Sequence, residues 1–253
     1  MRFVLVHGGF HGAWCWNRTI GELERLGHEA VAVDLPGHGE RRHETEPTTV
    51  AGRTAAVVAA LREGDVLVGH SGGGFDITHA ADARPDLVAH VCYLAAALPR
   101  EGRTWPEAMA TRADGTMGDF DVAGMLRHLA VDGDGSMSVA TVEGARELFF
   151  HDCDDETVRW AFERLGPERG GETSTAAVSV PRFWAADIPR SFIRCLQDRA
   201  MPPWLSELVA ERLGVQAQTI DTSHSPFLSR PAELAALLVA AANTTPVGPL
   251  RPD

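Results

Sequence analysis

Ser71 is the residue whose surroundings most directly indicate chemistry. It is the centre of the sequence Gly-His-Ser-Gly-Gly at 69–73, between an apolar run and a segment with helical spacing. A nucleophilic serine on a sharp strand-to-helix turn needs small neighbours and presents its hydroxyl at the top of a sheet. The alternative is a glycine turn that binds phosphate at a helix N-terminus. The sequence disfavours phosphate binding, because the chain has no lysine and no Gly-x-Gly-x-x-Gly after its first apolar run.

A serine hydroxyl is a weak nucleophile and needs a general base. His224 suits this role because it follows the last apolar run, which places it in a loop at the same sheet edge as Ser71. His7, His38 and His70 lie in other loops of that edge, but each belongs to a glycine-rich turn and is more typical of turn scaffolding. We therefore predict His224 as the base, with an ordinary loop histidine as the alternative.

An acidic side chain must hold the base in the correct tautomer. Asp198 follows the fifth apolar run and so reaches the edge that carries Ser71 and His224. Asp221 lies only three residues before His224 and would shape its loop, whereas Asp187 precedes the fifth run and lies at its wrong end. The order serine, aspartate, histidine along the chain is typical of nucleophiles on strand-to-helix turns. We therefore predict Asp198.

The negative charge of a tetrahedral intermediate needs fixed hydrogen-bond donors, each of which contributes about 3–4 kcal/mol. The turn after the first apolar run reads His-Gly-Gly-Phe at 7–10 and ends at the same sheet edge. We expect the backbone N–H groups of Gly9 and of Gly72, the residue after the nucleophile, to form this oxyanion hole. The alternative is that these glycines only permit tight turns.

The elements that position these residues alternate between strands and helices. Continuous apolar runs predict strands buried on both faces, which is typical of a parallel sheet covered by helices. These runs lie at 2–6, 29–35, 65–70, 87–95, 191–196 and 215–220. Helical spacing occurs between them at 13–26, 48–62, 74–83, 203–213 and 231–242. The alternation predicts a doubly wound α/β fold, mostly parallel, whose strand ends share one edge.

The stretch between the fourth and fifth strands interrupts this rhythm. It has helical segments at 142–150 and 156–165, shows no strong strand, and holds most of the excess acidic residues of the chain. We expect residues 1–99 and 190–242 to form the core, residues 100–189 a helical cap over the site, and residues 243–253 a frayed tail. The alternative is that the acidic stretch is a solvated flank without a role in the site.

Aromatic and apolar side chains near the expected site are candidates to line an apolar substrate pocket. Our principal candidates are Phe10, His70, Trp105, Phe149, Phe183 and Trp184. Phe120, Met125, Leu126, Phe150 and Trp160 are further candidates in the cap. For any one of them, the alternative of simple cap core is the more common outcome.

Composition excludes several function classes. The 23 basic residues are all arginine, so a Schiff-base lysine, a P-loop lysine and a Ser–Lys dyad are absent. The net charge of −12 argues against a nucleic-acid partner. We expect no membrane span and no signal peptide. The four scattered cysteines favour reduced thiols and a cytoplasmic location. The arginine- and alanine-rich composition is typical of a bacterial genome.

A metal site is not expected either. His151 and the run Asp-Cys-Asp-Asp at 152–155 match no trusted ligand spacing, and a solvated helix start explains them better. The expected partner is a small-molecule substrate, and the sequence leaves open whether the chain forms a homodimer.

Five motifs, considered together, carry a family resemblance; they lie at 3–16, 34–39, 69–74, 197–202 and 223–231. They resemble the α/β-hydrolase superfamily and, within it, the group of plant methylesterases, hydroxynitrile lyases and bacterial pyrethroid-type carboxylesterases. The resemblance implies a helical cap over the core sheet, a Ser71–His224–Asp198 triad, and a cofactor-independent enzyme for small, largely apolar esters.

Three positions depart from the relatives. Lyases of this group carry threonine where this chain has Gly8 and lysine where it has Ser225, which argues against cyanohydrin cleavage. Gly72 stands where relatives often have leucine, methionine or glutamine, and its lack of a side chain should leave room beside the nucleophile.

We therefore expect a serine carboxylesterase that works through an acyl-enzyme. A hydrolase or acyl-transfer enzyme for a lactone, a thioester or a natural-product intermediate is the alternative. A hydroxynitrile lyase and a low-turnover small-molecule receptor are less favoured.

Overall fold

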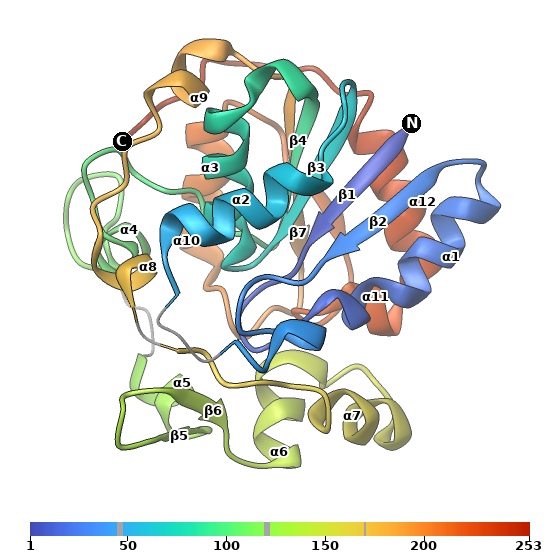
Figure 1. Cartoon of the computed structure of the whole chain (residues 1–253), viewed down its shortest axis with the longest axis vertical. Coiled ribbons are helices and arrows are strands. Elements are labelled where there is room, and N and C mark those ends of the chain that lie inside the picture. The colour runs from blue at the N-terminus through green and yellow to red at the C-terminus, as the bar shows by residue number, and fades with distance from the viewer. Residues whose placement is uncertain (45–47, 119–121, 170) are drawn as a thin grey trace.

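A six-stranded parallel sheet in the order β2-β1-β3-β4-β7-β8 forms the centre of the molecule (Figure 1). The computed structural model describes residues 1–44, 48–118, 122–169 and 171–253. The strands are β1 (Arg2–Val6), β2 (Glu29–Val33), β3 (Asp65–His70), β4 (Val88–Leu94), β7 (Arg190–Cys195) and β8 (Gln218–Ile220). The predicted doubly wound sheet is confirmed. β8 begins three residues later than its apolar run suggested.

Each central strand is buried on both faces, as the apolar runs require. In β1, Phe3 and Leu5 belong to one buried cluster, whereas Val4 and Val6 belong to the other. Because successive side chains of a strand point to opposite faces, an uninterrupted apolar run needs helices on both sides of the sheet. Helices α1 and α12 cover one face, and α2, α3 and α10 cover the other (Figure 1).

The core helices follow the predicted segments closely. They are α1 (Asn17–Arg25), preceded by a 3-10 turn, α2 (Val50–Ala60), α3 (Gly73–Ala83), α10 (Pro203–Leu213) and α12 (Pro231–Ala241). A short helix just before α12, α11 (Pro226–Ser229), was not predicted. Among the described residues, no helix is long and apolar enough to cross a membrane.

The stretch between β4 and β7 holds short helices and also a β-hairpin that we did not predict. Its elements are α4 (Trp105–Ala110), α5 (Val122–Leu126), β5 (Leu129–Val131), β6 (Met137–Val139), α6 (Val142–Ala145), a π-helical turn (Arg146–Phe150), α7 (Asp155–Phe162), α8 (Glu172–Thr175) and α9 (Pro181–Ala186). Strands of three residues are too short to give a recognisable apolar alternation. Elements α5 to α7 form a layer at one end of the sheet (Figure 1).

The end of this stretch lies against the core rather than over the site. Helix α9 packs on α3, and its Phe183 is buried in the same cluster as Ile77 of α3. Asp82 at the end of α3 accepts hydrogen bonds from the backbone N–H groups of Arg182 and Phe183, at 2.7 and 2.9 Å. The region predicted as cap therefore includes a helix that belongs with the core layer.

The C-terminal tail is bonded to the core, which differs from the frayed tail that we predicted. The guanidinium of buried Arg212 donates to the carbonyl of Pro252 at 2.7 Å, and buried Arg190 donates to the carbonyl of Gly248 at 3.0 Å. The N–H of Val247 donates to Gly214 at 2.8 Å. Proline- and threonine-rich composition indicated fraying, but arginines from β7 and α10 supply donors that the tail sequence itself does not reveal.

The start of α3 approaches the segment that follows β4 so closely that only glycine fits. A Cβ atom at Gly74 would lie 2.0 Å from the carbonyl oxygen of Ala97. We expect Gly74→Ala to lower the free energy of unfolding by about 3 kcal/mol, because neither backbone can yield. Gly21→Ala is the matched control in exposed α1, where an added Cβ meets nothing within 4 Å. It should raise stability by about 0.5–1 kcal/mol. Urea unfolding of both variants measures the difference, and equal midpoints would contradict the close approach.

Candidate active site

Ser71 lies on the turn between β3 and α3 and has a φ of 52°, in the left-handed region that side chains rarely adopt. Its N–H donates to the carbonyl of Leu94 at 3.2 Å, and its carbonyl accepts from the N–H of Ala97 at 3.1 Å. These bonds to the end of β4 hold the strained turn in place. A Cβ atom at Gly8 would lie 2.6 Å from the Cβ of Ser71, so the neighbouring loop also needs glycine.

His224 and Asp198 form the pair that the sequence predicts for base and orienting acid. Nδ1 of His224 lies 2.7 Å from Oδ2 of Asp198, and both side chains are buried, with 2% and 5% exposure. The other carboxylate oxygen of Asp198 accepts the N–H groups of Ala200 and Met201 at 2.8 and 2.9 Å. These two backbone hydrogen bonds fix the orientation of the Asp198 carboxylate. Since a carboxylate only accepts, Nδ1 of His224 carries the proton and Nε2 is the free basic nitrogen.

Two backbone donors face the same region. The N atom of Gly9 lies 3.8 Å from the place that a Cβ of Gly72 would take, so the two glycines are neighbours across the loop. Among the residues that the structure describes, neither N–H donates to a protein acceptor. Free donors side by side beside a serine can hold a developing oxyanion. These are the two residues whose N–H groups the sequence assigns to this role.

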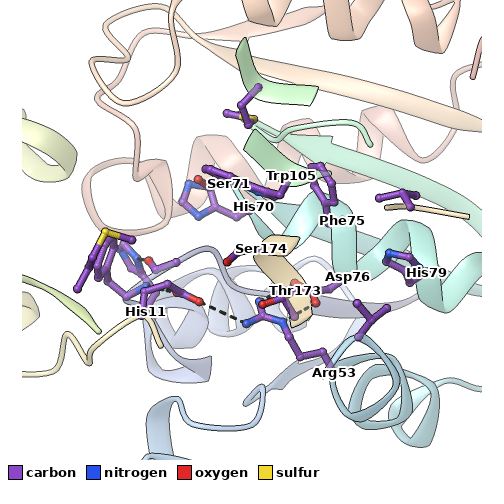
Figure 2. Close-up of a pocket in the computed structure, with 18 of the residues that line it drawn as sticks. His11, Arg53, His70, Ser71, Phe75, Asp76, His79, Trp105, Thr173 and Ser174 are labelled. Atoms are coloured by element: carbon purple, nitrogen blue, oxygen red, sulfur yellow. Dashed lines mark hydrogen bonds and ion pairs between the residues drawn. The ribbon is translucent and has the colours of Figure 1, made fainter. Parts of the chain in front are cut away.

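A cavity of about 430 Å³ is lined by Ser71, His224, Gly9 and Gly72. Figure 2 shows Ser71 and the neighbouring His70 at this pocket. Of the predicted pocket residues, the ones that line it are Phe10, His70, Trp105, Met125 and Phe149. Methionines from α4 and the hairpin add further apolar surface. This volume suits a small organic molecule.

Phe183 and Trp184 do not line this cavity, contrary to our expectation. Phe183 points from α9 into the core, where it is only 1% exposed. The indole N–H of Trp184 donates to Glu101 at 2.7 Å. Trp160 packs against Trp14 instead, Phe150 is core, and Leu126 is exposed. Phe120 lies outside the described residues. Aromatic type alone does not separate pocket from core, because both environments are apolar.

A buried polar cluster also lines the cavity, and sequence reasoning missed it. Both carboxylate oxygens of Asp76 accept from the guanidinium of Arg53, at 2.7 and 2.8 Å. Nη1 of Arg53 lies 3.5 Å from Oε1 of Glu168, which comes from the chain after α7. Figure 2 shows Arg53 and Asp76 apart from Ser71 across the pocket. No sequence signal marks these residues, since charged side chains in an acidic stretch and on a helix are ordinarily solvated.

The model of the alpha/beta hydrolase family matches residues 3–237. The chain belongs to the α/β hydrolase family. The predicted fold class and family resemblance are therefore confirmed.

Named relatives of this hydrolase include esterases. Methylesterase 18 of Arabidopsis thaliana is 29% identical over 261 residues, which cover 96% of this chain and 97% of that protein. The crystal structure of polyneuridine aldehyde esterase matches with a TM-score of 0.80 and 25% identity, over 96% of this chain and 99% of that one. A pyrethroid hydrolase from Sphingobium faniae JZ-2 shares the fold, with a TM-score of 0.79, 24% identity and coverage of 96% and 98%. These relatives support a hydrolase of the carboxylesterase type. Methylesterase 18 is a plant protein, so this match does not support the predicted bacterial origin.

The cap of this hydrolase bonds directly to the loop that carries His224. Oδ2 of Asp152 accepts the N–H of Ser223 at 3.0 Å, and the hydroxyl of Ser223 donates to the carbonyl of Phe149 at 2.8 Å. Asp154 caps α7 by accepting the N–H of Thr157 at 2.7 Å, as expected of a helix start. Within the described residues, no group of three or more His, Cys, Asp or Glu side chains could hold a metal ion.

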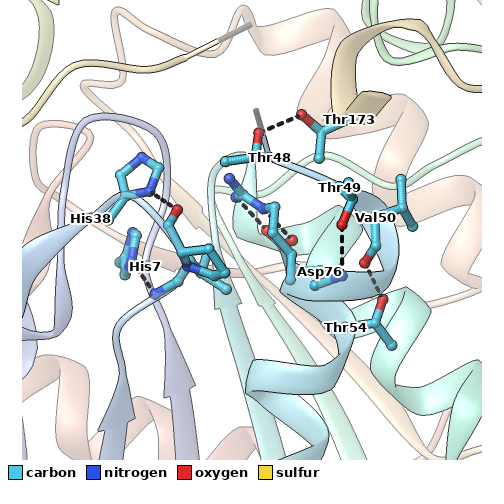
Figure 3. Close-up of polar contacts among 12 residues, drawn as sticks. His7, His38, Thr48, Thr49, Val50, Thr54, Asp76 and Thr173 are labelled. Carbon is cyan, nitrogen blue, oxygen red and sulfur yellow. Dashed lines mark hydrogen bonds and ion pairs between the residues drawn. The ribbon is translucent and has the colours of Figure 1, made fainter. Parts of the chain in front are cut away.

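The cap also bonds to the start of α2 (Figure 3). The hydroxyl oxygens of Thr48 and Thr173 lie 3.4 Å apart, and Oε2 of Glu172 accepts the N–H of Val50 at 3.2 Å. The cap is therefore bonded at three places: the His224 loop, the start of α2 and the turn that holds Gly9, where the N–H of Phe10 donates to Glu168.

Buried neutral histidines support the loops of the site. Burial lowers the pKa of His11 to about 4 and lowers the pKa of His7 and of His70 well below 6.5; nearby His38 and His224 add to the effect on His7 and His70, respectively. Each donates one ring N–H to a backbone carbonyl: His7 to Gly8 at 2.8 Å, His11 to Gly9 at 2.7 Å and His70 to His224 at 2.9 Å. These uncharged side chains support the loops that carry Gly9 and His224 through hydrogen bonds to their backbone.

These lowered pKa values predict acid sensitivity. Between pH 6.5 and about 4 the unfolded chain binds more protons than the folded one, so stability should fall as the pH falls through this window. We expect a steady melting temperature above pH 7 and a lower one at pH 5. His90→Gln should flatten part of this slope, because burial lowers the pKa of His90 to about 4. His43→Gln, at an exposed position, should leave the dependence of the melting temperature on pH unchanged. Differential scanning fluorimetry of the three proteins at constant ionic strength gives the comparison, and identical slopes would contradict it.

Proposed function

We propose that this hydrolase is a serine carboxylesterase that cleaves a small, largely apolar ester through an acyl-enzyme. One observation carries the proposal. The strained Ser71 opens into the same cavity as His224, whose protonated ring nitrogen is bound by Asp198 at 2.7 Å. A nucleophile, a base and an orienting acid on one sheet edge form the arrangement that acyl transfer requires.

In the proposed acylation step, Nε2 of His224 takes the proton of the Ser71 hydroxyl while Oγ attacks the ester carbonyl. Asp198 stabilises the imidazolium that forms, because its carboxylate already holds Nδ1–H. The carbonyl oxygen becomes an oxyanion and accepts hydrogen bonds from the N–H groups of Gly9 and Gly72. The tetrahedral intermediate then collapses, and the leaving alcohol takes the proton from His224.

The second half of the cycle uses the same groups in the same places. Water gives a proton to His224 and attacks the acyl carbon, and the acid leaves as Ser71 recovers its proton. Apolar walls from Phe10, Trp105 and Phe149 favour a substrate with apolar acyl or alcohol groups. All four cysteines are free and buried, which suits the proposed cytoplasmic location.

Ser71→Ala tests this function directly. The variant should lose at least about 10³-fold in kcat on p-nitrophenyl acetate and should no longer react with a fluorophosphonate, because the nucleophile is gone. Wild type and the control Ser138→Ala, a serine in β6 outside the cavity, should bind one fluorophosphonate per chain and turn over many esters. Full turnover by Ser71→Ala would refute the proposal. Labelling of the wild type without turnover would favour a receptor.

Gly72→Leu tests which part of the cavity receives the acyl chain. Gly72 has a φ of −56°, which any residue adopts, and an added Cβ would meet only the N atom of Gly9, at 3.8 Å. The new side chain should fill space beside Ser71 and reduce kcat/KM for p-nitrophenyl octanoate at least about tenfold relative to the acetate. Gly133→Leu is the control, at a hairpin position where a Cβ meets nothing within 4 Å. An unchanged octanoate-to-acetate ratio would mean that the acyl chain lies elsewhere.

A further inference from the structure

Phe10 is the strained residue of the proposed oxyanion turn. Its φ is 66°, which is unfavourable for a bulky side chain and persists only where the surroundings enforce it. It directly follows Gly9, so any rotation of the turn at Phe10 changes the direction of the Gly9 N–H. The strain therefore has to be held by contacts that outweigh it.

Those contacts come from the cap. The N–H of Phe10 donates to Oε2 of Glu168 at 3.2 Å, and its carbonyl accepts the N–H of Gly166 at 2.8 Å. Glu168 is itself fixed by two backbone hydrogen bonds with Met137 of β6, of 2.7 and 2.9 Å. Both polar backbone groups of the strained residue are thus bonded to one short cap segment, about 158 residues away in the sequence.

The carboxylate of Glu168 is held in an unusual place for a negative charge. Its Oε2 would lie 3.2 Å from a Cβ of Gly9, on the turn that carries one of the two proposed oxyanion donors. A bare anion there would oppose the reaction by repulsion. Nε2 of His38 lies 3.1 Å from Oε2, and Nη1 of Arg53 lies 3.5 Å from Oε1. Burial by itself raises the pKa of Glu168, but these partners outweigh it and bring the pKa to about 2.

We propose that Glu168 is a positioning residue for the oxyanion hole: its hydrogen bond to the N–H of Phe10 holds the Gly9 N–H toward the oxyanion that forms on the substrate carbonyl, while Arg53 and the ring N–H of His38 offset part of its charge. This rests on the proposed esterase function. The cap then serves catalysis as well as substrate binding, and Glu168 acts only through Phe10, without touching the substrate's reacting atoms.

Glu168→Ala removes the acceptor and should lower kcat/KM on p-nitrophenyl acetate about 10–100-fold, mainly through kcat. A trifluoromethyl ketone provides a second readout. Its carbonyl carbon bonds to Oγ of Ser71, its carbonyl electron pair becomes an oxyanion, and His224 receives the serine proton. Its inhibition constant should rise by the same factor as kcat/KM falls. The affinity for a neutral alcohol that competes with substrate should change less than threefold.

Two further variants separate positioning from folding. Glu168→Gln keeps an oxygen acceptor for Phe10 and should restore kcat/KM to within about fivefold of wild type. Glu168→Asp keeps the charge but has a side chain shorter by one methylene, so the variant should fold and still lose at least about fivefold in kcat/KM. It therefore tests the proposal even if the alanine variant does not fold. Glu101→Ala is the matched control: its carboxylate also accepts a backbone N–H, that of Val180 at 3.0 Å, but outside the cavity. It should retain wild-type kcat/KM.

The outcomes distinguish this proposal from the function on which it rests. A wild-type protein without Ser71-dependent esterase activity would refute the proposed function itself. An active wild type whose Glu168→Ala and Glu168→Asp variants keep their kcat/KM within twofold would overturn the positioning role alone. So would a loss of activity in Glu168→Ala without a matching loss of trifluoromethyl-ketone affinity.

Discussion

The strained backbone of Ser71 is the constraint on which the site depends. A φ of 52° places the Ser71 side chain at the top of the sheet. This strained conformation is stable because backbone hydrogen bonds to the end of β4 and the residues after it hold the turn, and because Gly8 has no side chain to collide with it. Gly8 lies against the serine itself, and Gly74 lies against the segment that follows β4, where a Cβ would be 2.0 Å from the carbonyl oxygen of Ala97. The position of Ser71 therefore depends on the order of the strands and on the placement of helix α3.

This requirement explains why the core of the site could be predicted from the sequence. In a parallel sheet with right-handed crossovers, every strand ends at the same edge, so residues just after apolar runs must converge. Ser71, Asp198 and His224 each follow such a run, and the structure brings them together. The prediction needed only local patterns and one topological rule, because no side-chain packing had to be known.

The cap could not be predicted in the same way. Its strands are three residues long, and whether an aromatic side chain lines the cavity or the core depends on contacts made far away in the sequence. Phe149 lines the cavity, whereas Phe183 of α9 is buried in the core. Arg53 and Glu168 are further examples: each looks like a solvated charge in its own segment, and only the approach of α2 to the chain after α7 gives them partners.

The buried charges of the cavity are difficult to explain by stability alone. Taking Arg53, Asp76 and Glu168 out of water costs free energy that their mutual attraction only partly offsets, and well-packed apolar replacements of such groups are often as stable or more so. Loss of a single partner, by contrast, costs about 3–5 kcal/mol, because it leaves a buried charge uncompensated. These three charged side chains thus contribute little to overall stability, but they form a rigid cluster, since each is held by the others. Stiffness at this place has a clear use: the outermost member, Glu168, bonds to the strained turn beside Gly9. The charges fix the direction of one backbone N–H more firmly than an apolar contact could, because a hydrogen bond to a fixed anion specifies both distance and angle.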